Sequence, residues 1–417
     1  MWRTEGANVV FQPMQGVKVV EVAQFTFTPS SGAVLADWGA DVIKVEHAVT
    51  GDAQRGLTIG TGGAAAGSFQ PLMDHPNRGK RSIGLDLAVP AGHAVLMELV
   101  QGADVFVTNF LTSARQRLHL EVEDVRAVNP KVIYVRGSGH GQRGPDAEKP
   151  GYDGSTFWSR MGSSWGTTPP DSPRAIVQPG GAYGDSMGGA IMAGGIAAAL
   201  FARDRTGEPS VIDVSLMSVG AWATALSITT ALLLGEPTPP PELTAPPYLP
   251  VNPTLGTFRT SDGRFITLMM LQPGRYFADT CRHLGIEHLL EDERFQTAEG
   301  LMANADEVGK HVAAAIATQP YAYWVDHFQT LEGPWAPAQN PLEIAHDPQM
   351  EANGYLLPVV DADGNDRTLV ANPVQFDETP PSVIRGPLFA EHTDDILREL
   401  GKSEDEIIQL KIDGACT

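Results

Sequence analysis

The 417-residue chain is poor in cysteine, in basic residues and in long apolar segments. Its 2 cysteines, Cys281 and Cys416, lie far apart, which argues against a disulfide framework and a cysteine-based metal site. Lys and Arg number 29 against 50 Asp and Glu, a formal charge of −21, which disfavours nucleic acid and anionic membranes as partners. No run of 18 uncharged apolar residues occurs and the first residues lack an apolar signal core, so we expect a cytoplasmic protein.

Several common motifs are also missing. The 11 histidines show no HExxH or HxH spacing, so we predict no metal site, and no G-x-S-x-G nucleophile motif is present. Residues 139–144, GHGQRG, fit G-x-G-x-x-G, but Pro145 and a polar stretch follow where a dinucleotide site needs a helix. We therefore expect a flexible active-site loop there, with His140 as a candidate functional residue.

The composition is that of a globular protein, with 42% apolar and 19% charged residues, and the length favours two domains. Strand patterns alternate with helix patterns through the first 140 residues, which predicts an α/β fold with a parallel, doubly wound sheet. The expected strands are residues 17–22, 41–46, 82–87, 104–108 and 131–136. Ligands of such sheets bind beyond the carboxyl ends of the strands, which here carry Gln24, His47, Asn109 and residues 137–140.

The remaining sequence suggests a change of organisation after residue 235. The apolar stretches 187–202 and 219–235 are rich in small residues and predict buried helices, and the proline-rich segment 236–253 predicts an extended crossing or linker. A hairpin over residues 256–270 and three helices then predict a small α/β unit. Two short strands and two amphipathic helices separated by Gly401 are expected near the C-terminus.

The stretch most informative about function is residues 179–213, in which a glycine-rich turn brings Asp185 to the start of a long helix. An acidic residue at such a place is often an N-cap that accepts a backbone N–H bond. The surrounding glycines favour a second interpretation, because Gly188, Gly189, Gly194 and Gly195 would let another backbone or a ligand approach closely. That environment suits a nucleophilic carboxylate.

The few basic residues occur partly in clusters, at residues 77–81 (NRGKR) and at Arg115 and Arg117. In an acidic protein they could be solvated counter-charges. They could also recognise phosphate groups, for which Arg forks and Lys point charges are suited.

Taken in order, the motifs resemble those of the family III CoA-transferases, a group that also contains α-methylacyl-CoA racemase. The resemblance covers roughly residues 15–405 and is weakest in the middle region. It is carried by VKVVEVAQFTFTPSSGAVLADWGADVIKVEH, NRGKRSIGLDL, ADVFVTNF, NPKVIYVRGSGHGQRGP, GYDG, GDSMGGAIMAGGIAAALFARDRTGE, VIDVSL, LEIAHDPQ and RGPLFAEHTDDILRELG.

The resemblance implies a large Rossmann-like domain built from both ends of the chain, with a small α/β domain inserted between them. We expect the first part of the large domain at 1–225, the small domain with its proline-rich crossing at 226–334, and the return to the large domain at 335–417. Two chains of this family are usually threaded through each other as an interlocked homodimer, which the extended crossing segment would suit.

The resemblance also implies the substrates and the site. Coenzyme A would arrive as an acyl-CoA donor and leave on a carboxylic acid acceptor, with no permanently bound cofactor. Asp185 would attack the thioester and pass through a mixed anhydride to an aspartyl-CoA thioester. His47 stands where many members carry an Arg beside the CoA phosphates. The residues expected at the CoA site are Gln24, Thr26, His47, Asn109, Phe110, Arg117, His140 and Tyr152.

Two alternatives remain. Racemases of the family pair the catalytic Asp with a His in a G-H-D motif, and this chain has Gly151-Tyr152-Asp153. Tyrosine, with a reference pKa near 10, is a poor replacement for that base, which favours transfer over racemisation. A CoA-binding protein without activity is the second alternative, against which the intact Asp185 motif argues. Candidates for lining an acyl pocket, suited to a bulky apolar acid, are Phe157, Trp158, Met161, Trp165 and Met187.

Overall fold

The computed structural model describes residues 11–57, 65–242 and 245–417, and the chain forms two compact units. Unit 1 consists of Met1–Pro241 and Pro348–Thr417, and unit 2 is the single intervening segment Glu242–Asp347. The borders expected from the sequence, after residues 225 and 334, do not coincide with these divisions. Helix α9 (Ala225–Leu234) belongs to unit 1, and strand β10 (Trp335–Pro337) pairs within unit 2.

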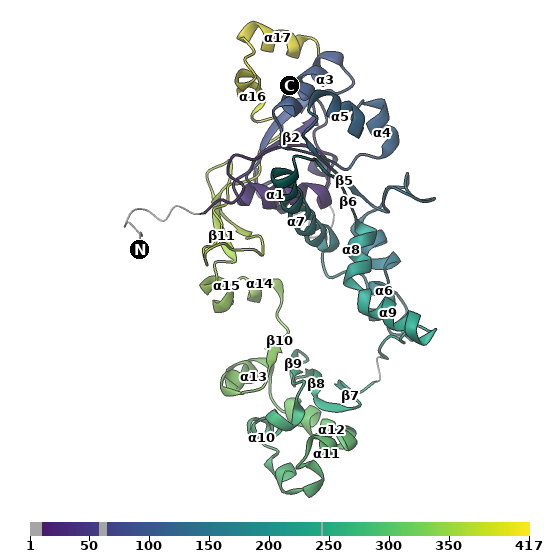
Figure 1. The fold of residues 1–417 in the computed structure, drawn as a ribbon. Helices are drawn as coiled ribbons and strands as arrows, with labels where there is room; N and C mark the ends of the chain where they lie inside the picture. The colour runs from purple at the N-terminus through teal and green to yellow at the C-terminus, as the bar shows by residue number, and fades with distance from the viewer. Residues whose placement is uncertain (1–10, 58–64, 243–244) are drawn as a thin grey trace. The chain divides into compact units, whose positions relative to one another are not determined.

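Unit 1 is built on a six-stranded sheet with the order β3-β2-β1-β4-β5-β6, in which every neighbouring pair is parallel (Figure 1). This confirms the predicted parallel α/β fold. Because β1 lies between β2 and β4, the strand order reverses its direction there, and ligands of open α/β sheets bind at such a switch point. The strands are β1 (Lys18–Val22), β2 (Asp41–His47), β3 (Arg81–Leu85), β4 (Val105–Thr108), β5 (Ile133–Ser138) and β6 (Val211–Ser215).

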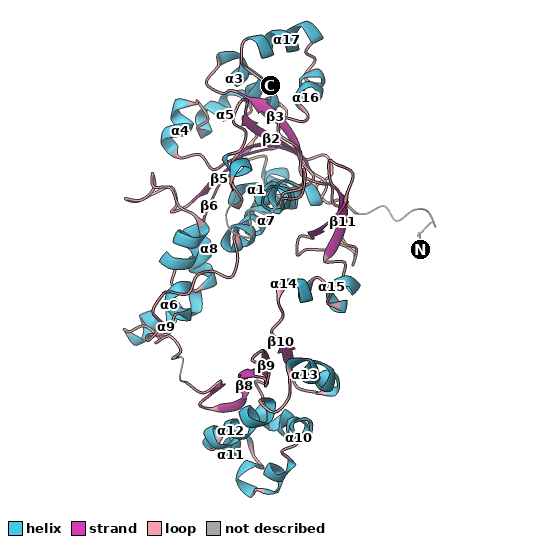
Figure 2. Ribbon diagram, turned by 180° about the vertical axis from the view of Figure 1, so that it is seen from behind, coloured by secondary structure: helices cyan, strands magenta, loops and turns pink. Residues whose placement is uncertain are grey.

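Helices cover both faces of this sheet (Figure 2). One apolar cluster joins the strands to α1, α7 and α8, and a second joins them to α3, α5, α16 and α17. The helices of unit 1 are α1 (Phe27–Asp37), α2 (Pro71–Asn77), α3 (Pro90–Gln101), α4 (Thr112–Arg117), α5 (Val122–Val128), α6 (Ser163–Thr167), α7 (Tyr183–Thr206), α8 (Leu216–Ala223), α9, α15 (Pro348–Ala352), α16 (Thr393–Glu399) and α17 (Glu404–Ile412). A 3-10 turn, η1 (Ala53–Gly56), a π-helix, η3 (Asp153–Arg160), and the antiparallel pair β11 (Leu356–Val360) and β12 (Asp366–Val370) complete the unit.

The glycines of α7 serve the packing of α7 on α1. A Cβ at Gly188 would lie 2.4 Å from the Phe27 ring, and one at Gly189 would lie 2.3 Å from the Ser30 Cβ. The close approach expected at these two glycines is therefore made by α1. By length and composition α7 could cross a membrane, but its Met192 and Ile196 are fully buried in the core of unit 1, as expected for a core helix.

The expectation of one buried helix over residues 219–235 is wrong. The helical segment is divided at Thr224 into α8 and α9, which are bent by 67°. None of the residues of α9 is buried in unit 1, and Leu226, Leu232 and Leu233 are 80–83% exposed. The segment is apolar as expected, but the described elements of unit 1 do not cover the apolar side chains of α9.

Unit 2 contains a four-stranded antiparallel sheet of order β10-β9-β8-β7, packed with helices around its own apolar core. The expected hairpin is formed by β8 (Asn252–Arg259) and β9 (Phe265–Met269), and β7 (Tyr248–Leu249) adds an edge. The helices are α10 (Pro273–Leu284), α11 (Ala298–Ala303), α12 (Ala305–Ile316), α13 (Tyr321–His327) and α14 (Pro341–Ile344), with 3-10 turns η4 (Glu287–Glu291), η5 (Glu293–Phe295) and η6 (Phe328–Thr330).

Candidate active site at the switch point

A cavity of about 510 Å³ lies in unit 1 at the carboxyl ends of β1, β4 and β5. Gln24 follows β1 and Asn109 follows β4, and the two residues are joined by two hydrogen bonds. The Gln24 N–H donates to Asn109 Oδ1 (3.1 Å), and Asn109 Nδ2 donates to the Gln24 carbonyl (2.7 Å). The lining also includes Asp185. The carboxylate thus faces the space at the switch point, within the 300–1,000 Å³ range typical of small-molecule sites.

Asp185 is the third residue of α7 and is not an N-cap. The cap position is held by Ala182, whose φ of 59° ends the glycine-rich turn in the left-handed region. Asp185 is half-buried, and among the described residues its carboxylate accepts no hydrogen bond. The capping interpretation is therefore wrong: the carboxylate is left without a structural partner and is available to a ligand.

The charge environment of Asp185 favours its protonated form. Burial and the nearby Asp153 carboxylate raise the pKa of Asp185 from 3.8 to about 8. Asp153 itself accepts hydrogen bonds from the Gly154 N–H (2.7 Å) and from Gln178 Nε2 (2.8 Å). A strongly shifted carboxyl in a cavity is a common mark of a reactive site.

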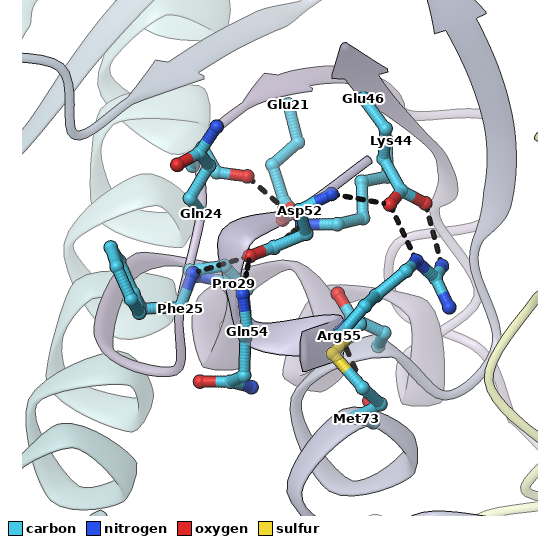
Figure 3. A network of polar contacts seen from close by, with 12 residues as sticks. Glu21, Gln24, Phe25, Pro29, Lys44, Glu46, Asp52, Gln54, Arg55 and Met73 are labelled. Carbon is cyan, nitrogen blue, oxygen red and sulfur yellow. Dashed lines mark hydrogen bonds and ion pairs between the residues drawn. The ribbon is translucent and has the colours of Figure 1, made fainter. Parts of the chain in front are cut away.

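The turn between β1 and α1 forms one wall of the cavity. Phe25 has a φ of 66°, uncommon for a bulky residue, and its N–H donates to Asp52 Oδ1 (3.1 Å), as Figure 3 shows. The Phe25 ring packs edge-on against Tyr152, with ring centroids 5.6 Å apart, and both residues line the cavity. Neither Phe25 nor Asp52 was expected from the sequence, because strained backbone leaves no pattern in a single chain.

Three cationic residues, Arg115, Arg117 and Lys149, belong to the lining of the cavity. Arg117 is exposed at the end of α4 and has no ion-pair or hydrogen-bond partner among the described residues. Lys149 pairs with Asp146 at 2.7 Å. Arg115 is buried and donates to the Phe110 carbonyl (2.6 Å), so it supports the wall on which Phe110 lies. Lys149 was not anticipated, since it stands alone in a polar loop.

The structure brings together five of the eight residues expected at the CoA site, namely Gln24, Asn109, Phe110, Arg117 and Tyr152. Three lie outside this lining. Thr26 is buried and donates to Gln54 Oε1 (2.8 Å). His47 lies at the end of β2, where its Nδ1 accepts from the Val49 and Thr50 N–H groups. The Nδ1 of His140 faces Arg160 Nη1 at 3.1 Å.

The cluster at residues 77–81 is structural. Arg78 is buried and forks onto Asp37, with Nη2 2.8 Å from Oδ2. The Lys80 Nζ lies 2.8 Å from both Glu21 oxygens, and Arg81 pairs with Asp41 and Glu399. The first interpretation, that of counter-charges, therefore describes these residues, although two of them are buried rather than solvated.

The apolar residues after the G-Y-D-G motif divide into two groups. Phe157 is buried in the core of unit 1, and Met161 packs against Gly220, so neither is free to line an acyl pocket. Trp158 Nε1 donates to the Ile176 carbonyl (2.8 Å). Trp165 and Met187 remain exposed, by 58% and 39%.

Comparisons with known proteins agree with this geometry. The sequence matches CoA-transferase family III over residues 14–393. It is 32% identical over 407 residues to a cinnamoyl-CoA:phenyllactate CoA-transferase of Clostridium sporogenes, covering 95% of this chain and 96% of the relative. It is 30% identical over 414 residues to the α-methylacyl-CoA racemase of Homo sapiens, with 96% of each covered. A crystal structure of a CAIB/BAIF family protein from Brucella suis superimposes with a TM-score of 0.78 at 29% identity, covering 93% of this chain and 99% of that one.

Proposed function

The chain belongs to CoA-transferase family III, and from that premise we propose that it moves CoA between carboxylic acids through covalent intermediates on Asp185. Overall identity does not select the reaction, because a transferase and a racemase are about equally similar to the chain. The observation that carries the proposal is the unpartnered Asp185 carboxylate facing the cavity at the switch point.

The proposed reaction consists of four acyl transfers. The Asp185 carboxylate attacks the thioester carbonyl of the donor and expels CoA thiolate, which leaves a mixed anhydride. The thiolate attacks the Asp185 carbonyl of this anhydride, releasing the donor acid and forming an aspartyl-CoA thioester. The acceptor carboxylate attacks that thioester and expels the thiolate, and the thiolate then attacks the acceptor carbonyl to give the new acyl-CoA and free Asp185. No proton or electron is gained or lost over the cycle.

The start of α7 supports each tetrahedral intermediate. The first turn of a helix has unpaired N–H groups and a partial positive charge, which stabilise an oxyanion formed beside it. A carboxylate is a weak nucleophile, so much of the rate must come from positioning, which the paired Gln24 and Asn109 can supply in the same cavity lining.

The described cavity fits an acyl-CoA as substrate. Arg117 and Lys149 offer positive charge for phosphate groups, in a chain whose formal charge is −21. Tyr152 lines the cavity, and Tyr183 and Met187 lie on the first turns of α7. Their side chains are 56%, 43% and 39% exposed. We propose that these side chains receive a bulky apolar acyl group.

The racemase alternative requires two groups that exchange a proton with the α-carbon. Within the described lining, Asp185 is accompanied by Tyr152 and not by a histidine, and His140 is directed at Arg160. A tyrosine phenol is a poorer base for this purpose than a histidine imidazole. In deuterated water a 2-methylacyl-CoA should therefore gain no α-deuterium while CoA exchange with an added acid proceeds.

The central experiment incubates the protein with cinnamoyl-CoA and phenyllactate, and in parallel with a panel of other acyl-CoA and acid pairs, and identifies products by mass. Adding hydroxylamine or borohydride during turnover should mark the peptide that contains Asp185. Asp185→Ala should lose both exchange and labelling. Full exchange by Asp185→Ala, or rapid α-deuterium incorporation by the native protein, would overturn the proposal.

We also propose that the protein assembles as an interlocked homodimer. Support comes from the exposed leucines of α9, which no described element of unit 1 covers, and from residues 236–242, which form no helix or strand. Large exposed apolar patches in soluble proteins usually mark interfaces.

A further inference from the structure

The turn that holds Gln24 and Phe25 in the cavity wall is clamped from two sides. On one side, Asn109 occupies both the N–H and the carbonyl of Gln24. On the other side, Asp52 Oδ1 accepts the Phe25 N–H at 3.1 Å and also the Gln54 N–H at 2.9 Å. Asp52 does not line the cavity and is almost completely buried.

Asp52 is in turn held by a buried set of charges (Figure 3). Its Oδ2 lies 2.8 Å from Lys44 Nζ, and its own N–H donates to Glu46 Oε2 at 2.9 Å. Both side chains of the Asp52–Lys44 pair are inaccessible to solvent. Burial alone would lower the pKa of Lys44, but Asp52, Glu21 and Glu46 outweigh it and raise that pKa, so the lysine stays ionised. Its position is therefore fixed by strong, unscreened interactions.

The backbone at Phe25 needs such a support. Its φ of 66° lies in the left-handed region, which a bulky residue seldom adopts unless its surroundings impose it. This conformation places the Phe25 ring against Tyr152 and leaves Gln24 beside Asn109, with all four in the lining that contains Asp185. If the Phe25 N–H lost its acceptor, the turn would be free to relax toward negative φ and carry both side chains with it.

From this geometry we infer that Asp52 is a positioning residue for the transfer reaction: it holds the Gln24–Phe25 turn in its strained conformation and so sets the part of the cavity wall that these two residues form. The inference rests on the proposed function. It assigns Asp52 no contact with substrate. Its Oδ1 accepts directly from the turn, whereas its Oδ2 pairs with Lys44, whose Nζ also donates to the Ala23 carbonyl at 2.9 Å, a bond that both double variants described below would lose equally.

The test uses two double variants of the full-length protein with the same charge balance. Asp52→Asn with Lys44→Met removes the ion pair but keeps a side-chain oxygen for the Phe25 N–H. Asp52→Ala with Lys44→Met removes the ion pair and the acceptor together. Replacing a buried ion pair as a unit is often tolerated, whereas removing one partner leaves a buried charge, so single variants are avoided.

We expect the Asn-containing double variant to keep a kcat within about threefold of the native value, and the Ala-containing one to lose about 10- to 100-fold in kcat. The KM for the acyl-CoA should change little in either, since the phosphate-binding cations are untouched. Glu21→Gln is the control: it perturbs the same buried charges, through Lys80 and Lys44, but does not touch the turn, so it should lower the melting temperature with kcat retained.

Equal kcat values for the two double variants, at equal folded fractions by circular dichroism, would overturn the inference. So would a loss confined to KM. If the Ala-containing variant fails to fold, the Asn-containing variant decides, because a large loss of kcat in a folded protein that keeps the acceptor contradicts the assigned role. Failure of the proposed function would be distinct, since native protein would then show no exchange or Asp185→Ala would retain it.

Discussion

At the scale of single residues, the carboxylates of Asp185 and Asp52 differ in what surrounds them. Asp185 has no hydrogen-bond donor in the described chain and a pKa raised by burial and by Asp153 to about 8. Asp52, which is almost completely buried, has two backbone donors and a lysine. In the proposed reaction the same functional group is thus a nucleophile in one place and a fixed acceptor in the other, according to what surrounds it.

The raised pKa of Asp185 predicts a pH-dependent rate. Only the carboxylate attacks, and with a pKa of about 8 roughly a tenth of the free enzyme carries it at pH 7. The kcat/KM for the acyl-CoA should therefore rise with pH to a plateau above the pKa. Asp153→Asn removes the negative charge that helps to raise this pKa, so the midpoint should move to lower pH. A midpoint that stays in place or moves upward would contradict the assigned interaction.

The same shift predicts how stability depends on pH. Between the unfolded pKa of 3.8 and the folded value of about 8, the folded protein retains a proton that the unfolded chain releases, so native stability falls as pH rises through this window. Asp185→Asn removes that effect. The melting temperatures of Asp185→Asn and the native protein should be nearly equal at pH 4. At pH 8 the variant's melting temperature should be higher by a few °C. A difference independent of pH in calorimetry would contradict the shift.

Arg117 provides a prediction about binding. Because it is an unpaired cation at the cavity, Arg117→Met should raise the KM for acyl-CoA about tenfold with kcat nearly unchanged, and the effect should shrink at high salt. Arg205, which stacks on Phe201 at the far end of α7, is the matched control. Arg205→Met removes the same charge outside the cavity and should leave KM as it is.

At the scale of elements, two glycines of α7 have opposite roles that the sequence does not distinguish. Gly189 contacts α1, where a Cβ would lie 2.3 Å from Ser30 Cβ, whereas a Cβ at Gly194 meets nothing within 4 Å. Gly189→Ala should cost about 1–3 kcal/mol through overpacking. Gly194→Ala should gain about 0.5–1 kcal/mol from helix propensity. Denaturant unfolding of the two variants measures both, and equal effects would contradict this description of the α1–α7 contact.

The sequence predicted the elements well where their signal is local. The alternation of strand and helix patterns was sufficient to predict the parallel sheet. The apolar pattern over residues 187–202 was sufficient to locate α7. It failed where tertiary contacts decide, because the break at Thr224 and the π-helix at 153–160 have no periodic signature.

The residues of the candidate site could likewise be predicted only where their signal is local. Gln24, Asn109 and Asp185 were found because strand ends and a glycine-rich helix start mark them in the sequence. Phe25, Lys149 and the electrostatic role of Asp153 could not be found, since each depends on residues brought together from distant segments. His47 and Thr26 show the converse, because a place near a strand end does not fix the direction of a side chain.

At the scale of the whole molecule, α9 presents an apolar surface that requires a partner. Leu226, Leu232 and Leu233 together expose an apolar face on a helix with no buried residue in unit 1, and leaving it in water would cost about 25 cal/mol for each Å². A second copy of the chain is the partner implied by the family resemblance. In a symmetric dimer, the α9 helix of each copy would be buried in the contact.

This proposal predicts a dimer that survives dilution and depends on α9. In sedimentation the native protein should have about twice the 44.5 kDa chain mass at every concentration, because interlocked chains cannot separate without unfolding. Leu232→Lys with Leu233→Lys should strongly lower the yield of dimer by placing two charges in the contact. Ile412→Lys, at a 72% exposed position at the end of α17, adds charge elsewhere and should leave the dimer intact. A folded, active native monomer would contradict the assembly, whereas an intact dimer of the double variant would move the interface away from α9.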